Sequence, residues 1–214
     1  MQSVFEFYRD LPARPERPER LFFGLRPDPE TALRVDQFSR QFLDQKHWKG
    51  VPLETERLHI SLHHVGDYRR LKTQFLYAAK RAAAAVSVRP FAVTFRFIKS
   101  VEDDPLTNGR PRKPLVLLAE GDALPELHNI LSVAMKKNGL RAAEHFTPPP
   151  HMTLSYGRGT IPKQAIEPIC FAVNEFVLIH SELWLTRHHV LDRWPLHATA
   201  DGTVDASMRY HGLD

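Results

Sequence analysis

The feature that most constrains the fold is an order of predicted elements that the chain follows twice. In each half a strand is followed by a helix, a second strand, a second helix and a third strand. A repeat of this length is too long for one unit of a solenoid, and it favours two related lobes packed about an approximate two-fold axis. The sequence therefore predicts a bilobal protein with lobes at roughly residues 20–101 and 114–195.

Hydrophobic periodicity and the positions of glycine and proline set the expected bounds of each element. The first half gives strands at 21–26, 57–66 and 89–101 and helices at 27–48 and 67–86. The second half gives strands at 114–121, 151–156 and 171–185, helices at 123–140 and 161–169, and a final strand at 184–192. A linker rich in proline and charge, residues 102–113, joins the halves. We expect one domain over residues 1–197 and a loose, aperiodic C-terminal tail over 198–214.

Composition limits the class of protein. Apolar residues make up 43% of the 214 residues and charged residues 25%, which is typical of a folded globular chain. The net charge of +4 does not indicate a protein that coats duplex nucleic acid, but it is compatible with a small anionic ligand.

The chain has no segment expected to enter a membrane. No stretch reaches the roughly 18 apolar residues of a membrane span, and charges and prolines interrupt the N-terminus before a signal peptide could form. The single cysteine, Cys170, lies in an apolar run, and we expect it to be a reduced core residue. These features predict a cytoplasmic protein.

Two short motifs recur at matching places in the halves. His59-Ile60-Ser61-Leu62 and His151-Met152-Thr153-Leu154 both fall on the third predicted element. Composition alone gives about 0.15 expected matches to His-x-Ser/Thr-Leu in a chain with 12 histidines. Because residues i and i+2 of a strand share a face, each motif presents an imidazole beside a hydroxyl. Two-fold packing is expected to bring the two pairs face to face.

This arrangement suits the opening of a cyclic phosphodiester. The reaction needs a base on the attacking water and an acid on the departing ribose oxygen, and two imidazoles can divide these roles. The hydroxyls of Ser61 and Thr153 are expected to hold the non-bridging phosphate oxygens. The sequence leaves open which of His59 and His151 is the base.

With these motifs and the opening RLFFGLRPDPETA, the chain resembles the 2H phosphoesterase superfamily, and within it the 2'-5' RNA ligase-like proteins that act as RNA 2',3'-cyclic phosphodiesterases. The resemblance covers roughly residues 20–195. It implies an α+β fold with an antiparallel sheet in each lobe and an active cleft between them, with no metal and no cofactor. It further implies hydrolysis to a 2'-phosphomonoester, with ATP-independent ligation as the reverse reaction.

The chain departs from the family at one position of interest. Many relatives carry Arg shortly after the second motif, where this chain has Tyr156, followed two residues later by Arg158. We expect Tyr156 to share the face of His151 and Thr153, where it can stack on a base, donate a hydrogen bond or serve as a packing residue at the rim.

Other histidines leave alternatives open. His63 is expected on the face of His59, lining the cleft or serving structure, and the pairs His63-His64 and His188-His189 could supply metal ligands. No HExxH motif or cysteine pair accompanies them. A third alternative is a non-catalytic module that binds RNA ends. The substrate is expected to be an RNA end or a cyclic nucleotide, such as a cyclic phosphate of ADP-ribose, and the protein is expected to be a monomer.

Overall fold

The computed structural model describes residues 16–101, 113–183 and 185–197. The predicted tail at 198–214 and nearly all of the linker at 102–113 lie outside these residues. The helices are α1 (Pro29–Gln45), α2 (Thr73–Ala84), α3 (Leu124–Lys137) and a short 3-10 helix, η2 (Thr55–Arg57). The strands are β1 (Glu19–Leu25), β2 (Lys49–Pro52), β3 (Ile60–Tyr68), β4 (Phe91–Ser100), β5 (Lys113–Glu120), β6 (His151–Arg158), β7 (Gln164–Val173), β8 (Glu175–Glu182) and β9 (Arg187–Pro195).

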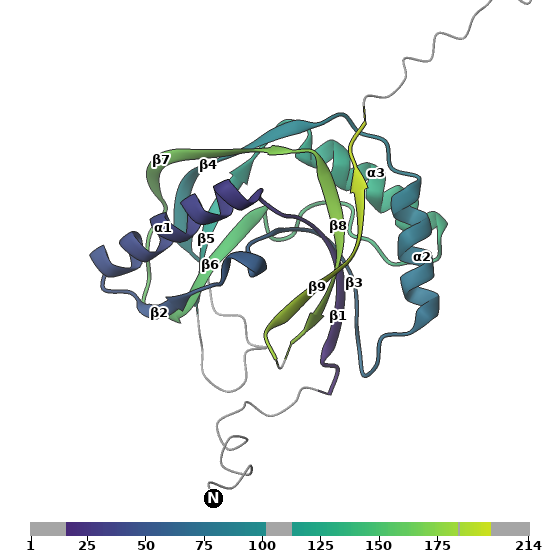
Figure 1. Ribbon diagram of the computed structural model, residues 1–214, viewed down its shortest axis with the longest axis horizontal. Coiled ribbons are helices and arrows are strands. Elements are labelled where there is room, and N and C mark those ends of the chain that lie inside the picture. Colours follow the sequence, from purple (N-terminus) through teal and green to yellow (C-terminus); the bar gives the residue numbers. More distant parts are fainter. Residues whose placement is uncertain (1–15, 102–112, 184, 198–214) are drawn as a thin grey trace, which may run out of the picture.

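All of the strands belong to one antiparallel sheet that curves strongly (Figure 1). Its order is β7-β4-β5-β6-β3-β1-β8-β9, with β2 paired to β6. The β3–β6 junction at the centre consists of a single residue pair, Ile60 with Met152, so it is a narrow seam between two half-sheets. The expected α+β class with antiparallel strands is confirmed.

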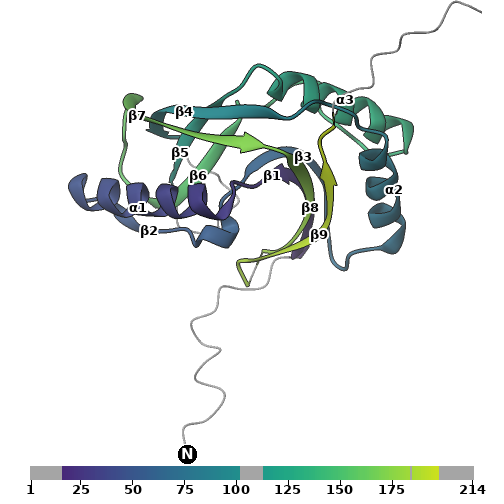
Figure 2. The ribbon, with the colours of Figure 1, turned by 45° about the horizontal axis from the view of Figure 1, so that its top comes forward.

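The two halves of the chain exchange strands. Strand β4 of the first half pairs with β5 and β7 of the second, and β8 of the second half pairs with β1 of the first. Helices follow the same rule, because α1 contacts β6 and β7 whereas α3 contacts β3 (Figure 2). The two sequence halves are therefore interleaved in space.

Local sequence explains the helix bounds. The carboxylate of Asp28 accepts hydrogen bonds from the backbone N–H and the hydroxyl of Thr31, and Pro29 opens α1 with a backbone angle that suits the first turn. Helix α3 carries Lys136 and Lys137 in its last turn and ends before Gly139, whose φ of 75° is readily adopted by glycine.

Three expectations about elements are wrong. Residues expected as a helix at 161–169 lie mostly in β7, where burial alternates at Ile169, Phe171 and Val173. The expected strand 171–185 is interrupted at Asn174, where β7 gives way to β8. The letters FAV, which recur at 91–93 and 171–173 in the third predicted strand of each half, suggested equivalent strands, but they lie in β4 and β7, and the strand order makes β8 the counterpart of β4 about the central seam.

Several bounds also differ by two or more residues, and one strand was not expected. Helix α2 begins at Thr73 rather than at residue 67, since β3 continues to Tyr68. Strand β2 follows α1 and pairs with β6 at the position where Gly50 faces Gly157. The indole of Trp48 packs so closely there that a Cβ on Gly157 would lie 2.3 Å from its Nε1 atom.

Cys170 is a further correction. Its side chain is exposed rather than in the core, and its sulfur lies 3.2 Å from the Thr94 hydroxyl oxygen. The reason is the period of two in β7, which turns Ile169 and Phe171 inward and Cys170 outward.

The two faces of the sheet differ in character. One large apolar cluster runs through both half-sheets and includes Phe23, Ile60, Leu117 and Met152. The opposite face of the β3-β1-β8-β9 half carries a small separate cluster of Phe22, Val177, Ile179 and Val190. No helix of the described residues is long and apolar enough to cross a membrane.

Candidate active site

The two histidine motifs meet at the central seam. Ile60 and Met152 are directly paired and fully buried, so the residues on either side of each point to the other face of the sheet. That face carries His59, Ser61, His151 and Thr153. The two pairs lie on adjacent strands, one on each side of the narrow seam between the half-sheets.

A β-bulge follows the hydroxyl residue in each motif. Leu62 is the extra residue where Phe23 and Gly24 of β1 pair with His63 and Ser61. Leu154 is the extra residue where Leu115 and Val116 of β5 pair with Ser155 and Thr153. Bulges re-aim the side chains that follow them, so the matching bulges give both motifs the same local geometry.

The two imidazoles are oriented in the same way. Nδ1 of His59 lies 2.7 Å from the carbonyl oxygen of Arg57, and Nδ1 of His151 lies 2.8 Å from that of Pro149. Because a carbonyl only accepts, Nδ1 carries the hydrogen in both rings. In the neutral form, Nε2 of each ring is therefore left unprotonated and able to accept a proton.

His59 lies against aromatic rings. Its ring centroid is 5.0 Å from that of Phe22 and 5.1 Å from that of His188, which comes from β9. On β1, a Cβ at Gly24 would lie 3.0 Å from the carbonyl oxygen of Ile60, which is tighter than ordinary contact. Glycine at this position therefore lets β1 approach β3 closely beside the first motif.

The surroundings of His59 keep it neutral. The pKa of His59 is lowered to about 4, and burial is the largest cause. The charges of Arg57, His151 and Arg26 lower it further, whereas the hydrogen bond to the Arg57 carbonyl raises it. The effect of His151 shows that the two imidazoles are electrostatically close. At neutral pH His59 is poised to accept a proton.

The other expected site residues also reach this face. Ser61 is exposed, and Thr153 and Tyr156 are half-buried. In an uninterrupted strand Tyr156 would point away from Thr153, but the bulge at Leu154 returns it to the Thr153 face, where it pairs with Pro114 of β5. Arg158 is exposed near the end of β6.

A cavity of about 360 Å³ adjoins the motifs. Ser61 and His151 form one side of it, and the segment between α3 and β6 forms much of the remainder. Arg141, His145 and Phe146 contribute cationic and aromatic groups to its lining. The cavity is large enough for a nucleoside-sized group next to the histidines.

His63 does not lie on the face of His59. The bulge at Leu62 turns it toward α3, where it is only 3% exposed and its Nε2 lies 2.8 Å from the carbonyl oxygen of His128. The imidazole rings of His63 and His128 stack, with their centroids 3.9 Å apart. His63 is therefore a structural residue in this fold.

The two histidine pairs considered as metal ligands do not place both rings on one face. His63 and His64 point to opposite faces, and so do His188 and His189 on β9, where His189 bonds Glu182 at 2.7 Å. Within residues 16–101, 113–183 and 185–197, no group of three or more His, Cys, Asp or Glu side chains is arranged to hold a metal ion.

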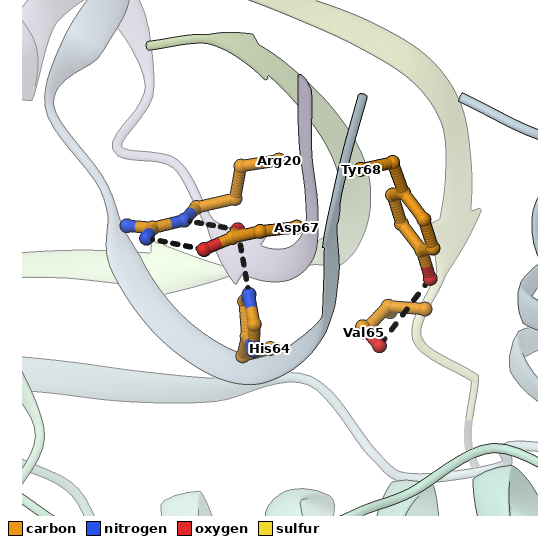
Figure 3. Close-up of polar contacts among 5 residues, drawn as sticks. All are labelled: Arg20, His64, Val65, Asp67 and Tyr68. Atoms are coloured by element: carbon orange, nitrogen blue, oxygen red, sulfur yellow. Dashed lines mark hydrogen bonds and ion pairs between the residues drawn. The ribbon is translucent and has the colours of Figure 1, made fainter. Parts of the chain in front are cut away.

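His64 instead joins an ion cluster on the site face (Figure 3). The guanidinium of Arg20 donates to both carboxylate oxygens of Asp67 at 2.8 and 2.9 Å, and His64 Nε2 lies 2.9 Å from one of them. Burial raises the pKa of Asp67, but the combined bonds and charges of Arg20 and His64 outweigh it and leave this pKa well below its usual value.

Arg57 and Arg26 near His59 were not identified from the sequence, and His188 was considered only as one of a pair of possible metal ligands. Arg57 precedes His59 by two positions, a spacing that could have indicated a shared face. Arg26 and His188 are brought there by β1 and by the curvature of β9, and no local pattern indicates either placement.

Comparison with known proteins is consistent with this fold. A family model described as the 2'-5' RNA ligase superfamily matches residues 27–183. No curated protein matches the chain significantly.

Solved structures resemble the fold at low sequence identity. TT0787 of Thermus thermophilus is 21% identical with a TM-score of 0.60, over 83% of this chain and 97% of that one. E. coli LigT in its apo form is also 21% identical with a TM-score of 0.60, over 85% and 99%. Kluyveromyces marxianus Usb1 is 11% identical with a TM-score of 0.51, over 83% and 97%. The family match spans most of the chain, so this protein belongs to the 2'-5' RNA ligase superfamily, as its resemblance to the 2H phosphoesterases implied.

Proposed function

We propose that the protein hydrolyses a 2',3'-cyclic phosphate to a 2'-phosphomonoester without a metal ion, using His59 and His151 as the proton-transfer pair. The observation that carries this proposal is the matched orientation of the two rings. Both rings bond a backbone carbonyl through Nδ1. Each therefore has Nε2 available for proton transfer on the face that also carries Ser61 and Thr153.

We assign the base to His59 and the acid to His151. The lowered pKa of His59 keeps its Nε2 unprotonated at neutral pH, and the negative charge of a bound phosphate raises its basicity. His59 takes a proton from water as the water oxygen attacks phosphorus. The bond from phosphorus to the ribose O3' breaks, and O3' takes a proton from Nε2 of His151, which enters this step as the imidazolium with a hydrogen on both nitrogens.

The two hydroxyls complete the site. Those of Ser61 and Thr153 donate to the non-bridging oxygens, where charge shifts in the transition state. Proton exchange with solvent afterwards restores both histidines. The same steps, with the hydroxyl of a second RNA end in place of water, join a cyclic phosphate end to that hydroxyl: the hydroxyl oxygen attacks phosphorus, the bond to O3' breaks, and no ATP is needed.

The relatives support a nucleotide substrate. E. coli LigT has been solved in complexes with 3'-AMP, with ATP and with phosphate. In this chain, the cavity beside His151 has room for the nucleoside that carries the cyclic phosphate. An RNA end is the proposed substrate, a small nucleotide such as ADP-ribose cyclic phosphate is the second candidate, and the protein is expected to act as a monomer.

The test is hydrolysis of a 2',3'-cyclic mononucleotide and of an oligonucleotide with a cyclic phosphate end, both in EDTA. His59→Ala and His151→Ala should each lower kcat by about 100- to 10,000-fold, and the product should be the 2'-phosphate. His189→Ala is the matched control, because this exposed histidine lies on the opposite face of β9 from His188.

The outcomes separate the alternatives. Turnover that ignores both substitutions would exclude the two-histidine mechanism. Activity lost in EDTA and restored by a divalent cation would indicate a metal enzyme. Tight binding of the oligonucleotide without turnover would indicate a module that only recognises RNA ends.

A further inference from the structure

Two buried nitrogen atoms next to His59 lack a hydrogen-bond partner. They are Nε of Arg57 and Nδ1 of His188, and neither has a partner among the described residues. Buried polar groups in folded proteins are nearly always satisfied, so an unsatisfied donor at a site usually meets a ligand or water. The position of both atoms beside one proposed catalytic histidine calls for a common explanation.

The same region concentrates positive charge. Neither Arg57 nor Arg26 forms an ion pair within the part of the chain that the structure describes, although both are partly buried. Burial lowers the pKa of both guanidinium groups. Glu56 and Glu175 act on Arg26, and Glu54 acts on Arg57, but none of them forms an ion pair with these cations, so an anion that enters the site can compensate both charges further.

Three separate elements bring these groups together. Arg57 ends η2 immediately before the first motif, and its carbonyl oxygen holds the His59 ring. Arg26 directly follows β1, whose Leu25 pairs with Ile60. The curvature of β9 brings it into contact with η2 and places the His188 ring against that of His59.

We propose that Arg57, Arg26 and His188 form an anion site that holds the reacting phosphate beside His59. This inference rests on the proposed function and deepens it by naming the groups that bind the phosphoryl oxygens. The guanidinium of Arg57 donates through Nε, and His188 donates through Nδ1. Arginine suits this role because its planar fork matches phosphate oxygens.

The site also bears on the tyrosine at position 156. Tyr156 lies close enough to Arg57 to raise the pKa of its guanidinium, so the two side chains are near each other. Arg57 thereby supplies the cation that Tyr156 cannot.

The state of His188 fits a neutral donor. Burial is the largest cause that lowers its pKa to about 3, and the nearby charges of His59, Arg57 and Arg26 act in the same direction. The ring is therefore neutral at pH 7 and can hold its hydrogen on Nδ1. A bound phosphate should raise the pKa of both His188 and His59.

The test uses inorganic phosphate as the probe and measures its binding by calorimetry, without turnover. Arg57→Gln should weaken phosphate binding about 10- to 100-fold, and Arg57→Lys should recover part of it. Arg34→Gln is the matched control, since it removes the same charge from an exposed position of α1. Equal binding in Arg57→Gln and wild type would overturn the proposal.

A second measurement needs no variant. Phosphate added to the wild-type protein should raise the pKa of His59 and His188 in histidine NMR titrations, and unchanged values for both would overturn the proposal even if Arg57→Gln failed to fold. If phosphate binds here but cyclic phosphates are not hydrolysed, the anion site stands and the proposed function fails. If cyclic phosphates are hydrolysed but KM is unchanged in Arg57→Gln, the proposed function stands and the anion site fails.

Discussion

At the scale of single residues, the site depends on what surrounds each imidazole. His59 and His151 share one hydrogen-bond pattern, but His59 additionally contacts Phe22 and His188. The same residue type, in the same motif, thus occupies two environments. This asymmetry is the physical basis for giving the two histidines different roles, because a buried ring resists protonation.

The hydroxyls are expected to act mainly in the transition state. Thr153→Ala and Ser61→Ala should each lower kcat by about 100-fold with little change in KM, because the lost hydrogen bond strengthens only as charge moves to the phosphate oxygens. Thr153→Ser retains the hydroxyl and should retain most activity. Steady-state kinetics on the cyclic mononucleotide gives both parameters, and a rise in KM with kcat unchanged would contradict the assignment.

Three partly buried histidines should make stability depend on pH. Burial lowers the pKa to about 4 for His59, about 3 for His188 and about 4 for His128. Below pH 6.5, the ordinary value, the unfolded chain binds protons that the folded chain does not. The free energy of unfolding should therefore rise with pH from about 3 to 6.5 and level off above.

Urea unfolding at pH 5, 6 and 7.5 measures this dependence. His188→Gln removes one of the titrating groups and should give a shallower rise over the same range. A flat free energy of unfolding between pH 5 and 7 would show that these rings are not held neutral by the fold.

At the scale of elements, two β-bulges and helix α1 position the site. The bulges at Leu62 and Leu154 fix which side chains reach the site face, and they turn His63 toward the core and Tyr156 toward the site. Helix α1 spans the other half-sheet and contacts β6, the strand of the second motif. The stability of α1 therefore supports the strand that holds His151.

The cap of α1 provides a direct test. Asp28→Ala removes the acceptor for the backbone N–H and hydroxyl of Thr31 and should lower the free energy of unfolding by about 1 kcal/mol. Asp28→Asn keeps an acceptor oxygen and should lose much less. Chemical denaturation of the two variants beside wild type makes the comparison, and equal losses would show that charge, rather than capping geometry, is what matters.

At the scale of the whole molecule, the halves depend on each other. Strand β4 forms its ladder only with strands of the second half, and the inner neighbour of β8 is β1 of the first half. Each half alone would expose an unpaired strand and part of a shared core. The molecule should therefore unfold as one cooperative unit.

Fragments cut within residues 102–112 test this dependence. The pieces 1–107 and 108–214 should each show little ordered structure by circular dichroism, and mixing or co-expressing them should restore the fold. The control is the intact chain carried through the same procedure. A fragment with a sharp unfolding transition of its own would show that the half is an independent domain.

The sequence by itself determined the features that depend on near neighbours. Helical periodicity and capping predicted α1 and α3 within a few residues, an apolar run predicted β1, and alternation predicted the strand of the first motif. The duplicated His-x-Ser/Thr-Leu motif indicated the family to which the chain belongs and named His59 and His151 as its candidate catalytic pair. These signals are local, because side-chain direction follows directly from backbone period.

The tertiary structure decided the features that depend on distant partners. The strand exchange, the pairing of the two FAV segments and the strand state of residues 164–169 follow from backbone hydrogen bonds between residues far apart in the chain. The arrival of His188 beside His59 depends on the curvature of the whole sheet. Local patterns say which way a side chain points from its strand, but only pairing and curvature determine what it meets there.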